Sequence, residues 1–396
     1  MRQNIWTFVL FFALATAIFE SFHLYLGWRL IRPAAFKPRT KRVLWILILS
    51  LPVFTPLTFT SRMIITEGVL TDIIGWVAYL EMGIFSLLLS MVLLKDLILA
   101  VKKLGARIVK VRKPAFNPER RQFVTNSVNL SLVGAALLFS GYGFYEARRR
   151  PLLEKIRIHI PGLPPVFEGY KIAQFSDLHV GPTIKRSFVQ SVTEQVNSLD
   201  ADAIVFTGDM VDGSVPGLRN DVAPLKDLSA RDGVYFITGN HEYYSGALAW
   251  IDHVSKLGFI PLIDEHRVIL KSGEPLIMAG VTDYSAKSFI PEHTSDPHKA
   301  IAGAPDSRVR ILLAHQPRNI FEAASAGFHL QISGHTHGGQ YIPWSFLVTL
   351  SQPFIIGLHE YENTLIYVNR GTGYWGPPVR LGIPSEVTLF TLTGTG

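Results

Sequence analysis

Four long apolar runs occupy the first 150 residues and constrain the fold more than any other feature. They span about residues 5–26, 43–65, 73–94 and 123–145. Each is close to the ~20 residues that a helix needs to cross a bilayer. Buried helices of a soluble domain are the alternative, but four runs in succession with basic connectors between them favour a membrane. The sequence therefore predicts an all-α membrane domain of four transmembrane helices over residues 1–150.

Basic residues in the connectors predict the orientation of these helices. Lys and Arg are frequent between the first and second runs and between the third and fourth, whereas the second connector has no base except Arg62 at its edge. The positive-inside rule places the two basic connectors in the cytoplasm. Arg148, Arg149 and Arg150 after the last run argue for the opposite orientation, but they are outnumbered. We therefore expect the C-terminal part outside the cytoplasm.

A pair of arginines precedes the fourth run. The segment Arg120-Arg121-Gln122-Phe123-Val124 resembles a twin-arginine export signal, here internal to the chain. Paired arginines before a membrane helix also occur by chance, so both interpretations stay open. If the signal is used, the C-terminal domain folds in the cytoplasm and the twin-arginine export machinery is a partner.

Charge and composition change near residue 150. Through Arg157 the chain has 22 Lys and Arg against 8 Asp and Glu, and from Ile158 onward it has 16 against 23. The basic excess therefore belongs to the membrane part, and we expect no nucleic-acid partner. Residues 151–165 contain four prolines and a glycine, a composition typical of a linker.

Short β-rich runs alternate with helix-like runs over residues 166–396. The sequence predicts strands near residues 171–176, 203–207, 234–238, 276–280, 309–313, 330–333, 364–368 and 387–392, and helices near 184–199, 221–228 and 247–256. Such alternation is typical of a layered α/β domain. The segment 342–357 is apolar and uncharged, and we interpret it as packed core rather than as a surface that faces lipid.

Side chains that bind metals follow several of these strands directly. Each of five predicted strands is followed within two residues by one such side chain: Asp177, Asp209, Asn240, His315 and His335. In open α/β sheets, ligands bind at the carboxyl ends of the strands, so these side chains are expected to converge. His337 follows His335 at i+2, and an extended segment would place both imidazoles on the same side. Neutral imidazole is the commonest metal ligand in proteins.

The types of side chain in this set limit the metals that it can bind. The chain has no cysteine, which excludes disulfides, thiolate-bound zinc and thiol catalysis. Aspartate, asparagine and histidine suit divalent ions such as Mn, Fe or Zn. The set is larger than one tetrahedral ion needs, so we expect two divalent ions that polarise a phosphoryl group and activate water.

These residues, taken in order, resemble the five motifs of the calcineurin-like metallophosphoesterases. The motifs are Asp177-x-His179, Gly208-Asp209-x-x-Asp212, Gly239-Asn240-His241-Glu242, His315 and Gly334-His335-x-His337. The resemblance begins near Tyr170 and extends to the C-terminus. Membrane helices followed by such a domain resemble the bacterial membrane-associated branch. This resemblance implies a four-layer β-sandwich flanked by helices, and a multi-pass protein of the bacterial inner membrane.

The resemblance also implies a role for each matching residue. One metal would be held by Asp177, His179 and His337, and the other by Asn240, His315 and His335, with Asp209 as the bridge. His241 would stabilise the phosphate charge or protonate the leaving oxygen, although a role without chemistry is the alternative. Asp212 and Glu242 would orient histidines rather than bind metal.

The sequence thus predicts a membrane-anchored hydrolase of a phosphodiester, a phosphomonoester or a lipid-linked pyrophosphate. A glycine-rich loop over residues 370–380 either lines the substrate mouth, with Arg370 or Arg380 on phosphate, or forms a structural turn. Two other classes stay open. One is a non-catalytic metal-binding membrane sensor, and the other is a transporter or scaffold in which the membrane helices do the work.

Overall fold

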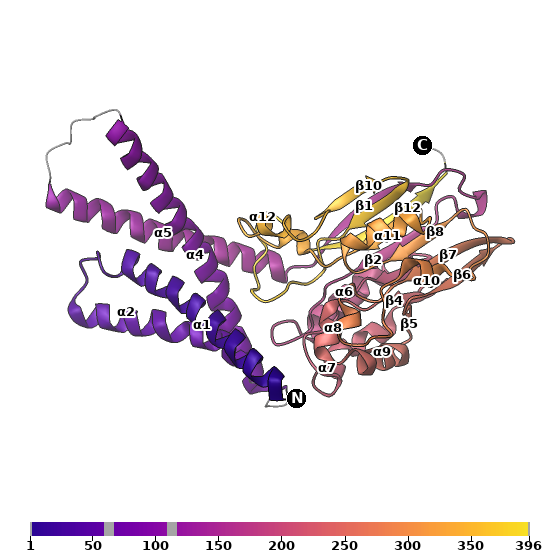
Figure 1. The fold of residues 1–396 in the computed structure, drawn as a ribbon, viewed down its shortest axis with the longest axis horizontal. Coiled ribbons are helices and arrows are strands. Elements are labelled where there is room, and N and C mark those ends of the chain that lie inside the picture. Colours follow the sequence, from indigo (N-terminus) through magenta and orange to yellow (C-terminus); the bar gives the residue numbers. More distant parts are fainter. Residues whose placement is uncertain (1, 59–66, 109–116, 395–396) are drawn as a thin grey trace. The chain divides into compact units, whose positions relative to one another are not determined.

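The computed structural model describes residues 2–58, 67–108 and 117–394, without the side chains of residues 2–9, 11 and 12. The chain divides into two compact units, Met1–Phe144 and Tyr145–Gly396 (Figure 1). The first unit is helical and the second contains all the described strands.

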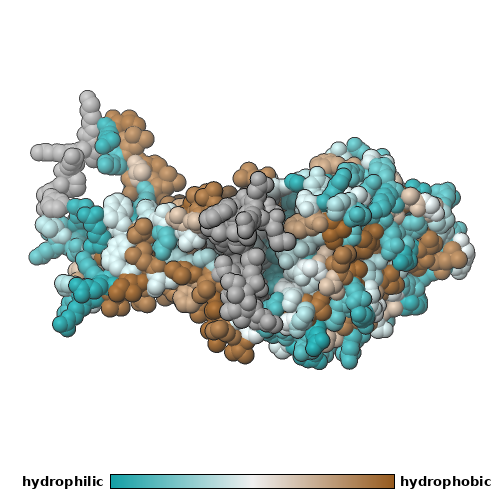
Figure 2. Space-filling view, turned by 60° about the horizontal axis from the view of Figure 1, so that its bottom comes forward, coloured by the Kyte–Doolittle hydropathy of each residue, from teal (hydrophilic) through white to brown (hydrophobic). Residues whose placement is uncertain are grey.

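Long helices make up the first unit. They are α1 (Arg2–Leu30), α2 (Pro38–Ser50), the short η1 (Leu51–Val53), α4 (Val69–Ile108) and the part of α5 (Pro118–Arg148) up to Phe144. Three segments are long and apolar enough to cross a membrane: Pro38–Thr58, Val69–Ile108 and Pro118–Arg148. Figure 2 shows hydrophobic side chains gathered on the surface of the helices. The second, third and fourth predicted runs thus correspond to membrane-length helices.

The first predicted run and the end of the second are not part of these three segments. The first run lies in α1, which is helical, and its crossing of the membrane stays a prediction. The last part of the second run, residues 59–65, lies outside the described residues. The third helix is longer than the sequence predicts, because α4 continues through the basic residues after Leu94 as far as Ile108.

Ionisable side chains within the helical unit are paired between helices. His23 of α1 lies 2.7 Å from Glu81 of α4 through its Nε2, and its ring stacks on Phe85 at 3.8 Å between centroids. Further along the same two helices, Arg29 forms an ion pair with Asp96. Polar groups in an apolar bundle are stabilised by such pairing, so these pairs hold α1 against α4.

Two six-stranded sheets form the centre of the second unit (Figure 1). The first sheet has the order β1-β12-β2-β3-β4-β5, with bounds Leu152–His159, Glu386–Thr393, Lys171–Phe175, Ala203–Phe206, Val234–Phe236 and Ile260–Pro261. The second has the order β10-β11-β9-β8-β7-β6, with bounds Gly357–Tyr361, Thr364–Val368, Leu330–Ser333, Arg310–Leu313, Glu274–Gly280 and Glu265–Lys271.

Alternating side chains of the strands form separate apolar layers. Val205 of β3 lies in the core between the sheets, together with Met278 and Ile311 of the second sheet, whereas Ile204 of β3 faces the outer helices. The helices on the first sheet are α6 (Arg186–Asn197), α7 (Val215–Val222) and α9 (Ala247–Lys256). The second sheet is covered by α10 (Pro297–Ile301) and α11 (Ile320–Ser325). The predicted four-layer β-sandwich flanked by helices is confirmed.

The predicted linker at residues 151–165 is wrong over more than half its length. Residues 152–159 form β1, which pairs in parallel with β12 along its whole length. Its side chains alternate in burial, and Ile158 is completely buried. Pro151 and Pro161 only bracket the strand, so the proline-rich composition hid an alternating pattern. Three strands, β5, β6 and β10, were also not predicted.

The interpretation of the segment 342–357 as packed core is wrong, because Gln352 is the only buried residue of the segment. It contains α12 (Ser345–Val348), a four-residue helix with no buried side chain. Phe346 is 68% exposed and Leu350 is 84% exposed. An uncharged apolar sequence does not by itself distinguish a core segment from an exposed one.

Candidate metal centre

The predicted ligands come together where strands of both sheets end. Asp177 follows β2, Asp209 follows β3, and Asn240 begins the short helix α8 (Asn240–Ser245) after β4. From the second sheet, His315 follows β8 and His335 follows β9. The carboxyl ends of parallel strands lie at one edge of a sheet, which brings these loops to one place.

One cluster contains Asp177, His179 and His337, all buried. The Nε2 atoms of the two histidines are 3.0 Å apart, and His337 Nε2 is 3.5 Å from Asp177 Oδ1. Asp177 also accepts the backbone N–H of His335 at 3.0 Å, which holds the loop after β9 against the loop after β2. Three ligand atoms from two loops thus surround one position.

A second cluster contains Asp209, His315 and His335. His315 Nε2 is 3.2 Å from Asp209 Oδ2 and 3.2 Å from His335 Nδ1. The other ring nitrogen of His315, Nδ1, donates to the carbonyl oxygen of Thr207 at 2.7 Å. That hydrogen bond fixes the tautomer and turns Nε2 toward the cluster, as is typical of metal-binding histidines.

Asp209 lies between the two clusters. Its Oδ2 is 3.2 Å from His315 of the second cluster and 3.7 Å from His179 of the first. The side chain is 2% exposed. The buried carboxylate is therefore within reach of imidazoles from both clusters.

The alternation predicts that His335 and His337 lie on the same side of an extended segment, and this prediction is wrong. They belong to different clusters, because the backbone turns at both residues, with φ of +72° and +51°. Asp177, His179 and Asp209 also have positive φ, between +51° and +57°. Such angles are rare outside glycine and are maintained at functional sites by the surrounding structure.

The residues present fit a metal ion at this site. The Oδ1 atom of Asn240 is buried and has no hydrogen-bond partner among the described residues. A buried carbonyl oxygen without a partner is costly and requires an explanation, and a cation would provide one. Burial and the neighbouring His315 lower the pKa of His335 to about 3, so this imidazole is in the neutral form that binds metal.

Asp212 contacts two imidazoles. Its Oδ1 accepts hydrogen bonds from the Nδ1 atoms of His179, at 3.2 Å, and His241, at 2.5 Å. Burial would raise the pKa of Asp212, but the charges of the two histidines outweigh it and lower the pKa. The Nε2 atom of His241 consequently lies on the Asp209 side, 4.0 Å from Oδ2.

Glu242 does not orient a histidine, which corrects the prediction for this residue. Its carboxylate is completely buried and accepts three backbone N–H groups, those of Gly239 at 2.7 Å, Asp209 at 2.9 Å and Met210 at 2.7 Å. It therefore ties the loop after β4 to the loop after β3. Glutamate three residues after the start of a helix commonly caps it in this way.

We expect Glu242→Gln to destabilise the second unit by about 3 kcal/mol, because an amide cannot accept three N–H groups as a carboxylate does. The measurement is the free energy of unfolding in urea, with the exposed Glu292 changed to Gln as a control. Equal stability of the two variants would contradict this role.

Both arginines proposed for phosphate binding have partners within the protein. Arg370 forms ion pairs with Glu154 and Glu386. Arg380 is completely buried and donates to the carbonyl oxygens of His337, at 3.2 Å, and Arg370, at 2.7 Å. Both arginines support the loop from the inside, so the glycine-rich segment is structural at these positions.

Two apolar side chains that the sequence did not single out lie beside His241. The ring of Tyr244 is 5.2 Å from the imidazole of His241, between centroids, and the ring of Trp375 is 5.8 Å from it. Both are more than half exposed. Trp375 belongs to the glycine-rich loop, where its neighbouring arginines gave the stronger signal.

The fold and the clustered side chains define the class: an α/β sandwich domain with a candidate metal centre at its strand ends. The family model for calcineurin-like phosphoesterase matches residues 170–339. A Danio rerio transmembrane protein with metallophosphoesterase domain is 33% identical over 328 residues, which cover 80% of this chain and 74% of that protein. The chain therefore belongs to the calcineurin-like phosphoesterase family.

Other similar proteins include bacterial ones. An uncharacterized metallophosphoesterase of Helicobacter pylori J99 is 34% identical over 71% of this chain and 75% of its own length. Among solved structures, the calcineurin-like phosphoesterase YfkN of Bacillus subtilis aligns with a TM-score of 0.34 at 14% identity, over 50% of this chain and 88% of that chain. Family membership supports a hydrolase of phosphate esters that uses divalent metal ions. The transmembrane relative and the membrane-length helices indicate a membrane protein.

Proposed function

We propose that this chain is a membrane-anchored phosphoesterase with a dinuclear metal centre. The observation that supports this proposal best is the position of the Asp209 carboxylate between two buried His and Asp clusters, 3.2 Å from His315 and 3.7 Å from His179. A single ion would leave one of the two clusters without a role.

In this proposal each side chain of the site has one role. Asp177, His179 and His337 would hold one ion, Asn240, His315 and His335 would hold the other, and Asp209 would be shared by both. When bound, a pair of divalent ions polarises the phosphoryl group and supplies a nucleophile derived from water. Asp212 and the carbonyl of Thr207 keep the imidazoles of His179 and His315 in the orientation that binding requires.

His241 is proposed to protonate the leaving oxygen. Burial alone would lower the pKa of His241, but the charges of Asp209 and Asp212 outweigh it and raise the pKa to about 9. The ring therefore carries a proton at neutral pH. Its Nδ1 donates to Asp212, which leaves the Nε2 proton for the substrate. A non-catalytic sensor would not need an acid held in this way.

The location of the active site is part of the proposal. The charge of the connectors supports a multi-pass protein of the bacterial inner membrane with the phosphoesterase unit outside the cytoplasm. The paired arginines Arg120 and Arg121 lie in the first turn of α5, and export by the twin-arginine route is a hypothesis from sequence alone. A membrane tether favours a substrate at the bilayer, such as a lipid-linked phosphate ester or pyrophosphate.

Metal reconstitution tests the dinuclear centre. The full chain, purified in detergent and stripped of metal, should bind two Mn²⁺ per chain in titration calorimetry. Hydrolysis of bis-p-nitrophenyl phosphate or p-nitrophenyl phosphate should be absent without metal and should return with Mn, Fe or Zn. Folded, metal-loaded protein that hydrolyses neither compound, or that binds a single ion, would contradict the proposal.

A further inference from the structure

An exposed apolar segment adjoins the metal centre. Four of its side chains, at positions 342, 346, 347 and 350, are 48%, 68%, 55% and 84% exposed. We name residues 342–350 the apolar lip. The lip has no charged residue, and none follows it before His359. Soluble surfaces rarely gather such side chains, which normally mark a contact with a partner or a membrane.

The lip is attached directly to a proposed metal ligand. His337 begins the short turn η6 (His337–Gly339), and the lip begins three residues after that turn. A Cβ atom on Gly339 would lie 2.3 Å from the Cα of Ser345, so the lip helix packs on the backbone of this turn. The position of the lip is therefore fixed relative to the metal centre.

Exposed aromatic side chains continue the apolar surface to His241. Gln340, just before the lip, forms two hydrogen bonds with the backbone of Trp375, and Trp375 is 51% exposed beside His241. Tyr244, on another element, is 62% exposed and also contacts the His241 ring. Phe289, 49% exposed, packs on Tyr244. The proposed acid thus lies among exposed apolar groups.

We propose that the apolar lip docks on the lipid bilayer that holds the helices, and that it presents the metal centre to the phosphate of a membrane lipid. This inference deepens the proposed function and rests on it for the substrate class. The chain itself supports a bilayer as the occupant. Helix α5 ends at Arg148 and β1 begins at Leu152, so only three residues connect a membrane-length helix to the sheet.

The C-terminal end of α5 also contacts the second unit directly. Ala147 is completely buried in the core of the second unit, and Arg148 donates to the carbonyl oxygen of Thr183 in the same unit. The last residues of α5 are therefore part of the second unit. An uncharged apolar surface enters the interface without the cost of desolvating charge.

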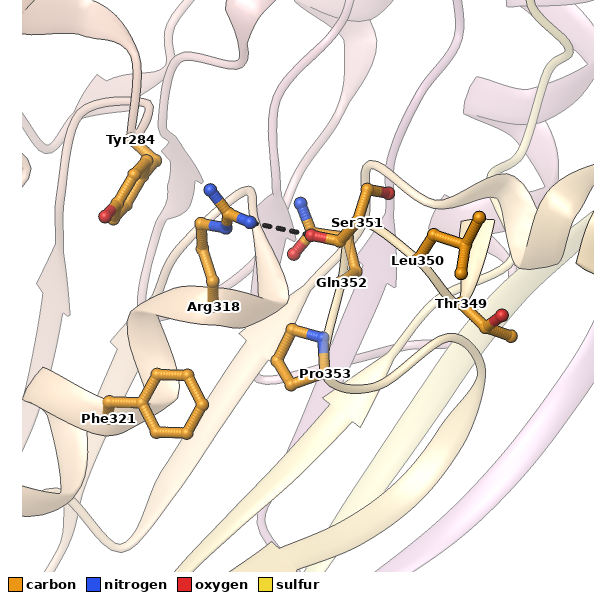
Figure 3. Close-up of a pocket in the computed structure, with 8 residues that line it drawn as sticks. All are labelled: Tyr284, Arg318, Phe321, Thr349, Leu350, Ser351, Gln352 and Pro353. Atoms are coloured by element: carbon orange, nitrogen blue, oxygen red, sulfur yellow. Dashed lines mark hydrogen bonds between the residues drawn. The ribbon is translucent and has the colours of Figure 1, made fainter. Parts of the chain in front are cut away.

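A cation beside the lip complements the charge of lipid headgroups. Figure 3 shows Arg318 between Tyr284 and the loop Thr349–Pro353, at a pocket of about 450 Å³ that includes Leu350 of the lip. The guanidinium lies 4.9 Å from the centre of the Tyr284 ring, and its Nε is buried without a hydrogen-bond partner among the described residues. An arginine beside exposed apolar side chains can contact lipid phosphate while its neighbours contact acyl chains.

The absence of cysteine allows a direct test of docking. Phe346→Cys in the full chain, labelled with an environment-sensitive nitrobenzoxadiazole and placed in nanodiscs of phosphatidylethanolamine and phosphatidylglycerol, should emit at shorter wavelength and be quenched by spin-labelled acyl chains. The matched control is Leu270→Cys on β6, where the native side chain is 66% exposed. Its label should emit as in water and remain unquenched.

Two results would overturn the proposal. One is a label at position 346 that behaves like the label at position 270. The other is emission at shorter wavelength without quenching by lipid, which would mean that a second copy or another protein covers the lip. Neither result depends on activity, so failure of docking is distinguishable from failure of the proposed function.

A double substitution tests the link to the substrate. Phe346→Asp with Leu347→Asp should lower the hydrolysis of phosphatidic acid or phosphatidylglycerol phosphate in nanodiscs by about tenfold, with turnover of bis-p-nitrophenyl phosphate unchanged. Leu270→Asp should change neither activity. Equal loss on both substrates, or no loss on the lipid, would show that the lip does not deliver lipid. Soluble turnover by the native chain without any lipid turnover would refute the substrate class alone.

Discussion

Asp209→Asn will lower the metal-dependent turnover of bis-p-nitrophenyl phosphate by about a thousandfold or more. The amide has the shape of the carboxylate but not its charge, and in the proposed centre two cations would share that charge. Asp209 Oδ2 is within 4.0 Å of His179, His241 and His315, so the loss affects every part of the centre. Calorimetry should show fewer than two bound ions per chain.

The control for this prediction is Asp306→Asn, because the side chain of Asp306 is fully exposed. It should keep native turnover and native metal binding. Retention of activity within about tenfold by Asp209→Asn, with two ions still bound, would show that the carboxylate does not bridge.

The strand pattern predicts that the candidate metal ligands gather at one edge, but alternation does not predict that His335 and His337 lie in different clusters, which only the family resemblance implies. Short apolar strands that end in Asp, Asn or His predict a common edge, and the structure places Asp177, Asp209 and His315 there. The backbone is left-handed at His335 and His337, and the two side chains therefore lie in different clusters. Tertiary contacts support this conformation, such as the hydrogen bond that the His335 N–H donates to Asp177. Pattern alone cannot predict such contacts.

Other errors have a related cause. Arg380 in a glycine-rich loop has the same local signature whether it points to solvent or inward, and only the packed structure shows that it is completely buried. The apolar segment after His337 likewise fits a core or an exposed lip equally well by hydropathy. β1 was hidden because two flanking prolines dominated the composition of a strand whose alternation is regular.

The second large effect is expected at His241. His241→Gln should lower the hydrolysis of alkyl phosphodiesters by about 10²–10⁴-fold. The rate of hydrolysis of bis-p-nitrophenyl phosphate should fall far less, because p-nitrophenolate leaves readily without a proton. This difference separates an acid from a residue that only supports the fold, since misfolding would lower both rates equally. An equal loss on both substrates would contradict the acid role.

The pH profile provides an independent test of the same acid. Because the folded pKa of His241 is raised, the protonated form is present at neutral pH and is lost as the pH rises through that pKa. Activity on alkyl phosphodiesters should therefore fall on the alkaline side, and this limb should be absent in His241→Gln. Burial lowers the pKa of His241, and the charge of Asp212 is one of those that raise it again. Asp212→Asn removes this charge, so the alkaline limb of the pH profile should move to lower pH. If the alkaline limb stays in place in both variants, the limb belongs to the titration of another group. His241 would then have no acid role and would serve only as a hydrogen-bond partner of Asp212.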